Sequence, residues 1–330
     1  MEVPRAGEAR GATGPASPAH RPWSSVSHDG APRLCAPPHL PVVGPELLVA
    51  LDVDGTIITH TGECLPEVYD AIRRVVEAGA HVVIATGRGP ESTGPVLEML
   101  GLTHGYAVSS NGAITLRLDP GVDGGFELLN VITFPPEQTL RRLRELVPTA
   151  LFMVEDGNAE RWVTQPFPEG EVMGTPRVLP FEEICQMPAS RVTLRAPDLE
   201  SADVHALLAD AGLHGVSYSV GWTAWVDIAP EGISKATGLD RIREHLNISP
   251  FATVAVGDGH NDHEMLQWAG WSIAMGQSWD STKLHANAVA PTVDEGGLAS
   301  VLNSLRFRPR PIPAQTPSLG DRDLAAGESG

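Results

Sequence analysis

The sequence predicts an open α/β fold, in which helices cover both faces of a mostly parallel sheet, with a second α+β domain inserted into it. Short apolar runs at 82–85, 253–256 and 271–275 are typical of buried strands, and segments with helical periodicity lie next to them. Apolar strands separated by helices indicate a parallel sheet. From 113 to 229 the strand candidates instead alternate in polarity, which predicts a separate sheet with one solvent-facing side.

The individual elements are predicted from the helical spacing of apolar residues and from short apolar or alternating runs typical of strands. An apolar strand is expected over 47–51, and a helix over about 66–78, where Val68, Ile72 and Val75 recur at helical spacing. The remaining predicted elements are a helix over about 262–269 in the core and, in the inserted domain, strands at 191–194 and 224–228 with helices at about 136–146 and 199–211.

A chain of 330 residues exceeds the usual size of a single core, so two domains with tails are expected. Both ends are rich in Pro, Gly, Ala and Ser without sustained periodicity, which predicts disorder. The predicted division is a tail over 1–44, a core domain over 45–112 and 230–305, the inserted domain over 113–229, and a tail over 306–330.

Composition excludes several classes of function. A net charge of −18 argues against a nucleic-acid or anionic-membrane surface, because such surfaces are bound through Lys and Arg patches. Cys35, Cys64 and Cys185 are isolated and odd in number, so neither a disulfide framework nor a cysteine-based zinc site is indicated. Neither a membrane-spanning run nor a signal peptide is evident, so a cytoplasmic protein is expected, with no obligate protein partner indicated.

Two carboxylates stand where the first predicted strand ends. Asp52 and Asp54 are two residues apart, so in an extended backbone they point to one side. They repel each other, which a divalent cation or a shared proton would relieve. Gly55 permits a sharp turn, and Thr56 can cap the next element. The pattern suits phosphoryl transfer to a carboxylate screened by a cation, whereas a calcium loop would need a Glu at fixed spacing downstream.

Hydrogen-bond donors follow the next strand. Thr86, Gly87 and Arg88 come directly after 82–85, at the carboxyl end where open α/β sheets place their ligands. A hydroxyl, a flexible backbone and a guanidinium can bind phosphate oxygens there, although the run alone also fits an ordinary strand-to-helix turn. Lys235 opens a later helix, and its ammonium either neutralises a nucleophile and a phosphate or is simply solvated.

A third polar loop follows the strand at 253–256. Asp258 can complete an oxygen-rich magnesium shell, because this ion takes only one or two protein carboxylates. Asp262 either supports that shell or is only an acidic residue at a helix start. His260 and His263 match no zinc motif, and no P-loop is present. The remaining candidates are His60 as a substrate contact and the tryptophans Trp222, Trp225, Trp268, Trp271 and Trp279, which are expected in the core or between domains, or against substrate from the inserted domain.

In this order the loops resemble the motifs of the haloacid dehalogenase-like (HAD) superfamily of phosphatases, over roughly 46–305. The motifs that carry the resemblance are Asp52-Val53-Asp54-Gly55-Thr56, Thr86-Gly87-Arg88, Lys235 and Gly257-Asp258 with Asn261-Asp262. Ser109-Ser110-Asn111-Gly112-Ala113 is similar to a segment of the Cof-type branch, and the insertion lies where the subfamily with a type IIB cap carries it. The resemblance implies a Rossmann-like core sheet with an inserted α+β cap.

The resemblance also implies roles for individual residues. Asp52 would be the nucleophile that forms an aspartyl phosphate, and Asp54 the acid and base for the leaving oxygen and the attacking water. Thr86 and Lys235 would hold the phosphoryl group. The other implied roles are magnesium ligands Asp52, the Asp54 backbone carbonyl and Asp258, supported by Asp262 and Asn261, and substrate contacts Gly87, Arg88 and Asn111.

These inferences predict a magnesium-dependent phosphatase for a small phosphorylated metabolite, with sugar phosphates as one candidate class. A sugar phosphomutase, a non-catalytic module that binds a phosphorylated ligand, and a calcium-binding protein stay open as alternatives. One departure from the Cof-type pattern stands after the Met275-Gly276 turn, where Gln277-Ser278-Trp279 replaces the usual Asn-Ala.

Overall fold

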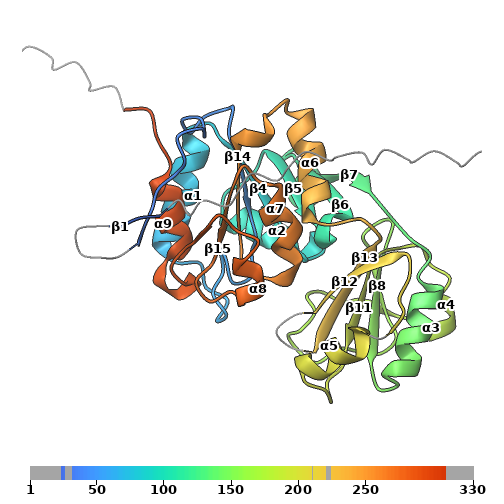
Figure 1. Ribbon diagram of the computed structural model, residues 1–330. Coiled ribbons are helices and arrows are strands. Elements are labelled where there is room, and N and C mark those ends of the chain that lie inside the picture. The colour runs from blue at the N-terminus through green and yellow to red at the C-terminus, as the bar shows by residue number, and fades with distance from the viewer. Residues whose placement is uncertain (1–23, 27–31, 210, 221–223, 310–330) are drawn as a thin grey trace, which may run out of the picture.

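The computed structural model describes residues 24–26, 32–209, 211–220 and 224–309, which form two large sheets, each with its own helices, and one small hairpin (Figure 1). The mixed α/β architecture with a large, mostly parallel sheet confirms the predicted fold class. Among the described residues, the helices are too short or too polar for any of them to cross a membrane.

The larger sheet has its first six strands parallel and its last two antiparallel. The strands lie in the order β16 (Ala288–Val289), β15 (Trp271–Ala274), β14 (Thr253–Gly257), β3 (Leu48–Leu51), β4 (His81–Ala85), β5 (Gly105–Ser109), β6 (Ile114–Leu118) and β7 (Phe126–Val131).

Helices cover this sheet on both faces because alternate side chains of its central strands are apolar in both directions. Val49 and Leu51 pack into one core cluster, while Leu48 and Ala50 pack into another on the opposite face. The first cluster includes residues of α1 (Pro66–Glu77), α2 (Pro90–Met99) and α9 (Gly297–Ser304), and the second residues of α6 (Lys235–His245) and α7 (His263–Trp268); the short α8 (Asp280–Lys283) leads from β15 to β16.

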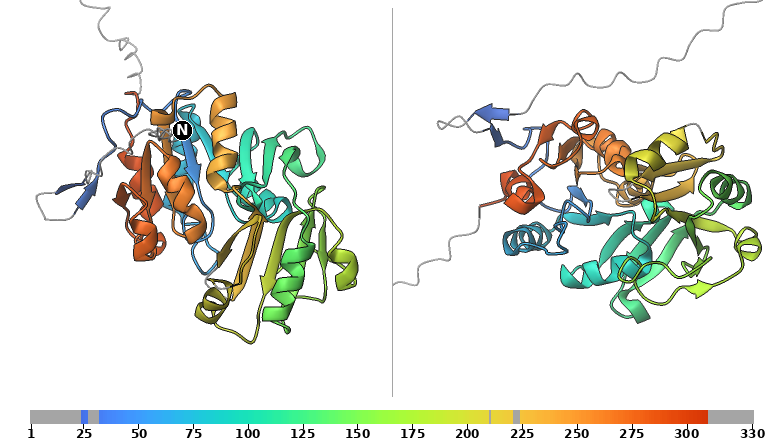
Figure 2. Two further views of the ribbon diagram at one scale, coloured as in Figure 1. Left: turned by 45° about the vertical axis from the view of Figure 1, so that its right-hand side comes forward. Right: turned by 90° about the horizontal axis from the view of Figure 1, so that it is seen from below.

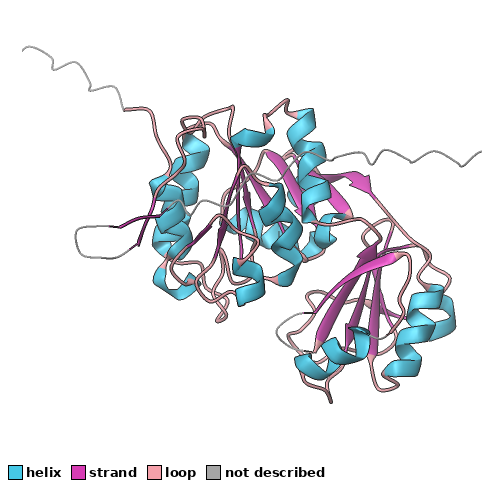
Figure 3. Ribbon diagram, viewed as in Figure 1, coloured by secondary structure: helices cyan, strands magenta, loops and turns pink. Residues whose placement is uncertain are grey.

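The smaller sheet is antiparallel except for one parallel pair at its edge. Its order is β10 (Arg177–Val178), β9 (Arg161–Val163), β8 (Leu151–Asp156), β11 (Ala189–Arg195), β13 (Trp225–Pro230) and β12 (Val216–Val220). The helices α3 (Glu137–Leu146), α4 (Phe181–Ile184) and α5 (Ser201–Ala209) contribute to one apolar cluster with this sheet, and α3 and α4 lie on the side away from the larger sheet (Figure 3). We call this sheet with its three helices the cap.

The two faces of the cap sheet differ in chemistry. Val154 and Leu194 point into the apolar cluster beneath the helices, and their neighbours Met153, Glu155 and Arg191 point to the other side. The sequence predicted that one side would be exposed to solvent. Instead, Glu155 is 1% and Arg191 6% exposed, because this side is turned toward the end of the larger sheet.

The boundary expected at residue 113 differs from the structure. Strands β6 and β7 pair with β5 and extend the larger sheet, so the chain leaves that sheet only after Val131. Antiparallel edge strands alternate in polarity like the strands of the cap, and the sequence pattern alone therefore assigned them to the insertion. The rest of the predicted domain division stays a prediction.

The N-terminal tail expected over 1–44 also differs in part. Ala36, Leu40 and Val43 are buried in the larger core, and the Val43 amide donates to the Arg306 carbonyl at 2.8 Å. Upstream of them β1 (Ser24–Val26) pairs with β2 (Pro32–Leu34). The apolar residues in this segment are separated by prolines and have no regular period, so composition obscured them. The expected tail residues 1–23, 27–31 and 310–330 lie outside the described part of the chain.

Candidate active site

The predicted functional loops converge at one edge of the larger sheet. Asp52 follows β3, Thr86 follows β4 and Asp258 follows β14, and these three neighbouring strands are parallel. Their carboxyl ends therefore meet at the same edge, where open α/β sheets bind ligands. A cavity of about 990 Å³ separates this edge from the polar face of the cap. Its lining includes Asp52, Asp54, Thr86, Gly87, Arg88, Asp258 and Asn261 from the core, and Met153, Arg161, Arg191, Trp225 and Asp227 from the cap.

Lys235 is a buried cation held between two carboxylates. Its Nζ donates to Asp52 Oδ1 at 2.6 Å and to Asp262 Oδ1 at 2.7 Å. Burial alone would lower the pKa of Lys235, but the charges of Asp262 and Asp52 outweigh burial and raise this pKa above its usual value. The first turn of α6 thus supplies a charged ammonium beside Asp52, and Lys235 is buried rather than solvated at the surface.

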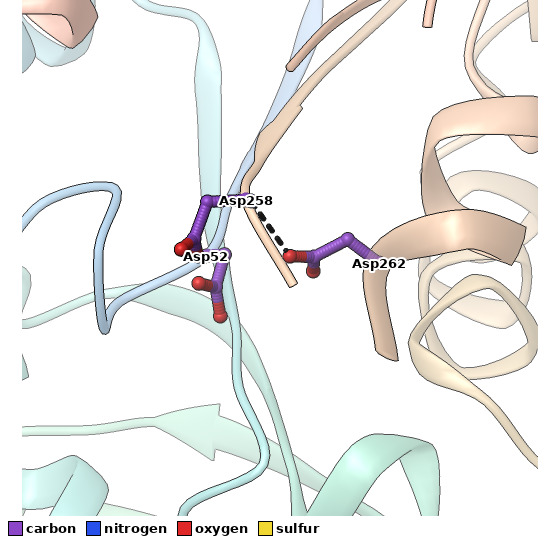
Figure 4. Close-up of side chains that lie close together, drawn as sticks. All are labelled: Asp52, Asp258 and Asp262. Carbon is purple, nitrogen blue, oxygen red and sulfur yellow. Dashed lines mark hydrogen bonds between the residues drawn. The ribbon is translucent and has the colours of Figure 1, made fainter. Parts of the chain in front are cut away.

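Asp262 uses both of its carboxylate oxygens within the protein. While Oδ1 accepts from Lys235, Oδ2 accepts from the backbone amides of Asp258 and Gly259, each at 2.9 Å. Figure 4 shows this carboxylate pointing at the Asp258 backbone. Asp262 therefore fixes the Asp258 loop and the Lys235 ammonium.

Asp52 and Asp258, with Asp262 behind them, form a carboxylate cluster that fits a divalent cation. Each offers an oxygen within 4.8 Å of the others, and Asp258 Oδ2 is buried without a hydrogen-bond partner. Burial, together with the negative charge of Asp262, raises the pKa of Asp52 to about 7, although Lys235 opposes this shift. Burial and the charge of Asp52 raise the pKa of Asp258 to about 9. One ammonium is too little charge for three buried carboxylates, and a divalent ion would supply the rest.

Asp54 lies beside this cluster but faces the open cavity. Its side chain is 61% exposed, and the Arg88 guanidinium holds both oxygens, with Nε at 2.9 Å from Oδ2 and Nη2 at 2.5 Å from Oδ1. This bidentate pair fixes the orientation of Asp54. Asp54 is thus placed at the entrance of the site and Asp52 at its base.

Thr86 lines the cavity, and Asn111, which is not among the described lining residues, lies hydrogen-bonded beside it. Thr86 Oγ1 accepts from the Arg88 amide at 3.1 Å, and the Thr86 carbonyl accepts from the Asn111 amide at 3.1 Å. Asn111 has φ +52°, and its side-chain oxygen accepts from the Asn261 amide at 2.9 Å. Gly87, Arg88 and Asn111 were expected to face the substrate. They lie close together, but of the three only Gly87 and Arg88 are among the described residues that line the cavity.

Other sequence candidates lie elsewhere or at the rim. His60 is exposed and is not among the described residues that line the cavity, whereas His260 does line it. Trp271 is buried in the core, while Trp225 and Trp279 line the cavity, Trp279 with 53% of its surface exposed. Trp222 lies outside the described residues.

Sequence reasoning missed the contribution of the cap and of Gln277. Gln277 Nε2 donates to the Gly55 carbonyl at 2.5 Å and its Oε1 accepts from the Val293 amide at 3.0 Å, so this departure from the expected Asn-Ala holds the turn after Asp54. Arg191 could have been noticed as a polar residue at an alternate position of a predicted strand, but the sequence gives no sign of what it contacts.

A model of the haloacid dehalogenase-like hydrolase family matches residues 49–130 and 177–302, which is more than half of the chain. The pyridoxal phosphate phosphatase YbhA of Escherichia coli (strain K12) is 30% identical over 258 residues, which cover 73% of this chain and 92% of that protein. The putative phosphatase YkrA of Bacillus subtilis (strain 168) is 27% identical, covering 78% of this chain and 97% of its own.

Among solved structures, the fold is similar to that of a sugar phosphatase of HAD subclass IIB. The two align with a TM-score of 0.66 and 21% identity, over 78% of this chain and 98% of the other. The similarity extends over both the larger sheet and the cap.

Proposed function

Because the chain belongs to the haloacid dehalogenase-like hydrolase family, as its motifs predicted, we propose that it is a magnesium-dependent phosphatase that hydrolyses a small phosphorylated metabolite through an aspartyl phosphate. Relatives that align over nearly their whole length are named phosphatases, which supports the enzyme class. The observation that carries the proposal is the position of Asp52, which lies at the base of the cavity between the Lys235 ammonium and the Asp258 carboxylate.

Asp52 is the proposed nucleophile. One of its oxygens is hydrogen-bonded to Lys235, which leaves the other oxygen to attack phosphorus. The bond from phosphorus to the ester oxygen then breaks, and water later cleaves the aspartyl phosphate. Magnesium, bound by Asp52, Asp258 and the Asp54 backbone carbonyl, would screen the negative charges of nucleophile and phosphate. Lys235 and Thr86 would hold the phosphoryl oxygens.

Asp54 is the proposed acid and base. Its carboxyl group would donate a proton to the departing ester oxygen and accept one from the attacking water. Arg88 keeps this side chain oriented toward the cavity through two hydrogen bonds. Substrate that displaces Arg88 from Asp54 would free the carboxyl group at the moment that chemistry requires it.

The cavity supports a small-metabolite substrate. Its volume of about 990 Å³ is at the upper end for small-molecule sites, so a phosphorylated sugar or cofactor fits and a folded macromolecule does not. Two relatives are named for such compounds, pyridoxal phosphate and 5-amino-6-(5-phospho-D-ribitylamino)uracil. We infer a substrate of this size class.

The variant Asp52→Asn tests the proposal. The amide cannot form the acyl phosphate, so we expect turnover of p-nitrophenyl phosphate with magnesium to fall by about 10⁴-fold or more. Asp70→Asn, at an exposed position of α1, is the matched control and should keep full activity. Retained turnover in Asp52→Asn, with the circular dichroism of the native fold, would rule out this nucleophile.

A metal and product readout accompanies this test. Chelation with EDTA should abolish turnover, and magnesium should restore it. Release of inorganic phosphate from sugar phosphates separates the phosphatase from a phosphomutase, which would return the phosphoryl group to the sugar.

A further inference from the structure

The cap carries a buried ion pair at the centre of its polar face. Arg191 Nη2 lies 3.3 Å from Glu155 Oε2, on neighbouring strands β11 and β8. Both side chains are almost completely buried, and Arg191 Nη1 also lies 3.5 Å from Asp227 Oδ1. Burial alone would lower the pKa of Arg191, but the charges of Glu155 and Asp227 raise it. Such a pair costs desolvation energy, and apolar residues would often be as stable in its place.

Each member of this pair also reaches across to the core. Arg191 Nη1 donates to the Gly87 carbonyl at 2.8 Å, and Ser110 Oγ donates to Glu155 Oε1. The two contacts fall on the two core loops that carry the proposed phosphoryl and substrate contacts, one after β4 and one after β5. The cap therefore makes direct bonds to the loop that carries Thr86 and to the loop that carries Asn111.

The core residues at this contact allow the cap side chains to come close. A Cβ atom at Gly89 would lie 2.0 Å from Glu155 Oε2 and 3.0 Å from Arg191 Nη2, so only glycine leaves room for the pair. Ser110 and Asn111 have φ of +50° and +52°, a left-handed conformation that is unfavourable for residues with a side chain. Ser110 is held in this conformation partly by its bond to Glu155.

We propose that Glu155 and Arg191 are positioning residues, which hold the Thr86–Arg88 and Ser109–Gly112 loops in the geometry that binds the phosphoryl group and the substrate. The expected effect on kinetics rests on the proposed function. The expected effect on the conformation of the two loops is independent of it. When either bond is lost, the loops sample other conformations and the competent fraction falls. Because apparent affinity scales with that fraction, KM should rise while kcat stays nearly constant.

Hydrogen exchange tests the structural part without any substrate. In Arg191→Met and Glu155→Gln, we expect amides of peptides covering 86–89 and 109–112 to exchange about tenfold faster than in the wild type, because a charged hydrogen bond that fixes each loop is gone. Arg191→Lys keeps the charge beside Glu155 and should fall between Arg191→Met and the wild type.

Arg161→Met is the matched control for exchange. Arg161 forms a second ion pair between cap and core, with Glu91 of α2, but it does not bond to either loop. We expect its loss to leave exchange of 86–89 and 109–112 unchanged. Equal acceleration in Arg161→Met would mean that any loosening of the cap has this effect, and unchanged exchange in both Arg191→Met and Glu155→Gln would mean that the pair positions nothing; either result overturns the inference.

Kinetics provide the second readout. For glycerol phosphate and p-nitrophenyl phosphate alike, KM of the Glu155→Gln enzyme should rise about tenfold and kcat should change by less than about twofold. Arg141→Met, on the outer helix α3, should match the wild type. If the wild type hydrolyses no phosphomonoester, the proposed function fails, while the exchange experiment still decides the role of the pair.

Discussion

At Gly55 the backbone passes so close to the Asp258 carboxylate that a side chain cannot fit. A Cβ atom there would lie 2.3 Å from Asp258 Oδ2, and φ is +80°. We therefore expect Gly55→Ala to displace Asp258 from Asp52 and to lower magnesium-dependent turnover by about 10²-fold or more. The measurement is turnover of p-nitrophenyl phosphate over a range of magnesium concentrations, which should show weaker metal activation as well.

Gly62→Ala is the control that separates the backbone strain of Gly55→Ala from its steric clash with Asp258. Gly62 has nearly the same backbone angle, φ +86°, but nothing lies within 4 Å of its Cβ position. It should lose about 1 kcal/mol of stability from backbone strain and keep its activity. Equal turnover in the two variants would show that the close approach at Gly55 has no catalytic consequence.

The sequence identified the core residues of the site because each stands directly after a buried strand or at a helix start. Asp52, Thr86 and Asp258 could be placed at one edge because each follows a strand that was expected to lie in a parallel sheet, and Lys235 lies there as the resemblance implied. Their catalytic roles stay a prediction. Arg191 could not be assigned in this way, since its contact with Gly87 depends on how the cap sits against the core.

At the scale of elements, α6 places Lys235 in the site and rests closely on β5. Gly238 is one turn after Lys235, and a Cβ atom there would lie 2.8 Å from Val108 Cγ1. In an exposed helix Gly→Ala would add about 1 kcal/mol of stability. Here we expect Gly238→Ala to cost about 1–3 kcal/mol instead, because the overpacked helix must shift. Urea unfolding measures the free energy, and turnover should fall as Lys235 moves.

A double mutant cycle with Val108→Ala supplies the control. Val108→Ala removes both methyl groups that a Cβ at residue 238 would meet, so in that background Gly238→Ala should become neutral or stabilising. If Gly238→Ala stabilises the wild-type protein, the close packing between α6 and β5 does not determine the position of Lys235.

Element types were predictable where the hydrophobic period was strong, as in the helix that became α1 and the strands that became β4 and β14. The sequence could not predict which sheet β6 and β7 join, because alternating polarity is typical of any half-exposed antiparallel strand. Which sheet such a strand joins depends on pairing partners, and these lie beyond the reach of a local pattern.

At the scale of the whole molecule, the site belongs to neither sheet alone. The core supplies the carboxylates and the ammonium, and the polar face of the cap lines the other side of the cavity. Figure 2 shows the cap beside the larger sheet in two further views. A chain with a net charge of −18 attracts phosphate esters poorly at long range. Under the proposed function, binding would come from groups at short range inside the cavity, namely Lys235, Arg88 and the proposed cation.

The segment before β3 extends the core of the whole molecule, and its removal should be costly. Leu40 and Val43 are 1% and 2% exposed, and the Arg306 side chain donates to the Leu40 carbonyl. Burial of two such side chains contributes about 3–6 kcal/mol, a large share of the 5–15 kcal/mol typical of a folded protein.

Deletion of 1–44 should therefore lower the urea midpoint sharply, as followed by tryptophan fluorescence. Deletion of 1–23 should leave the midpoint unchanged, because it spares every one of these contacts. Equal midpoints for the two deletions would mean that the packing of Leu40 and Val43 adds nothing to stability, and that the whole segment behaves as the tail its composition suggested.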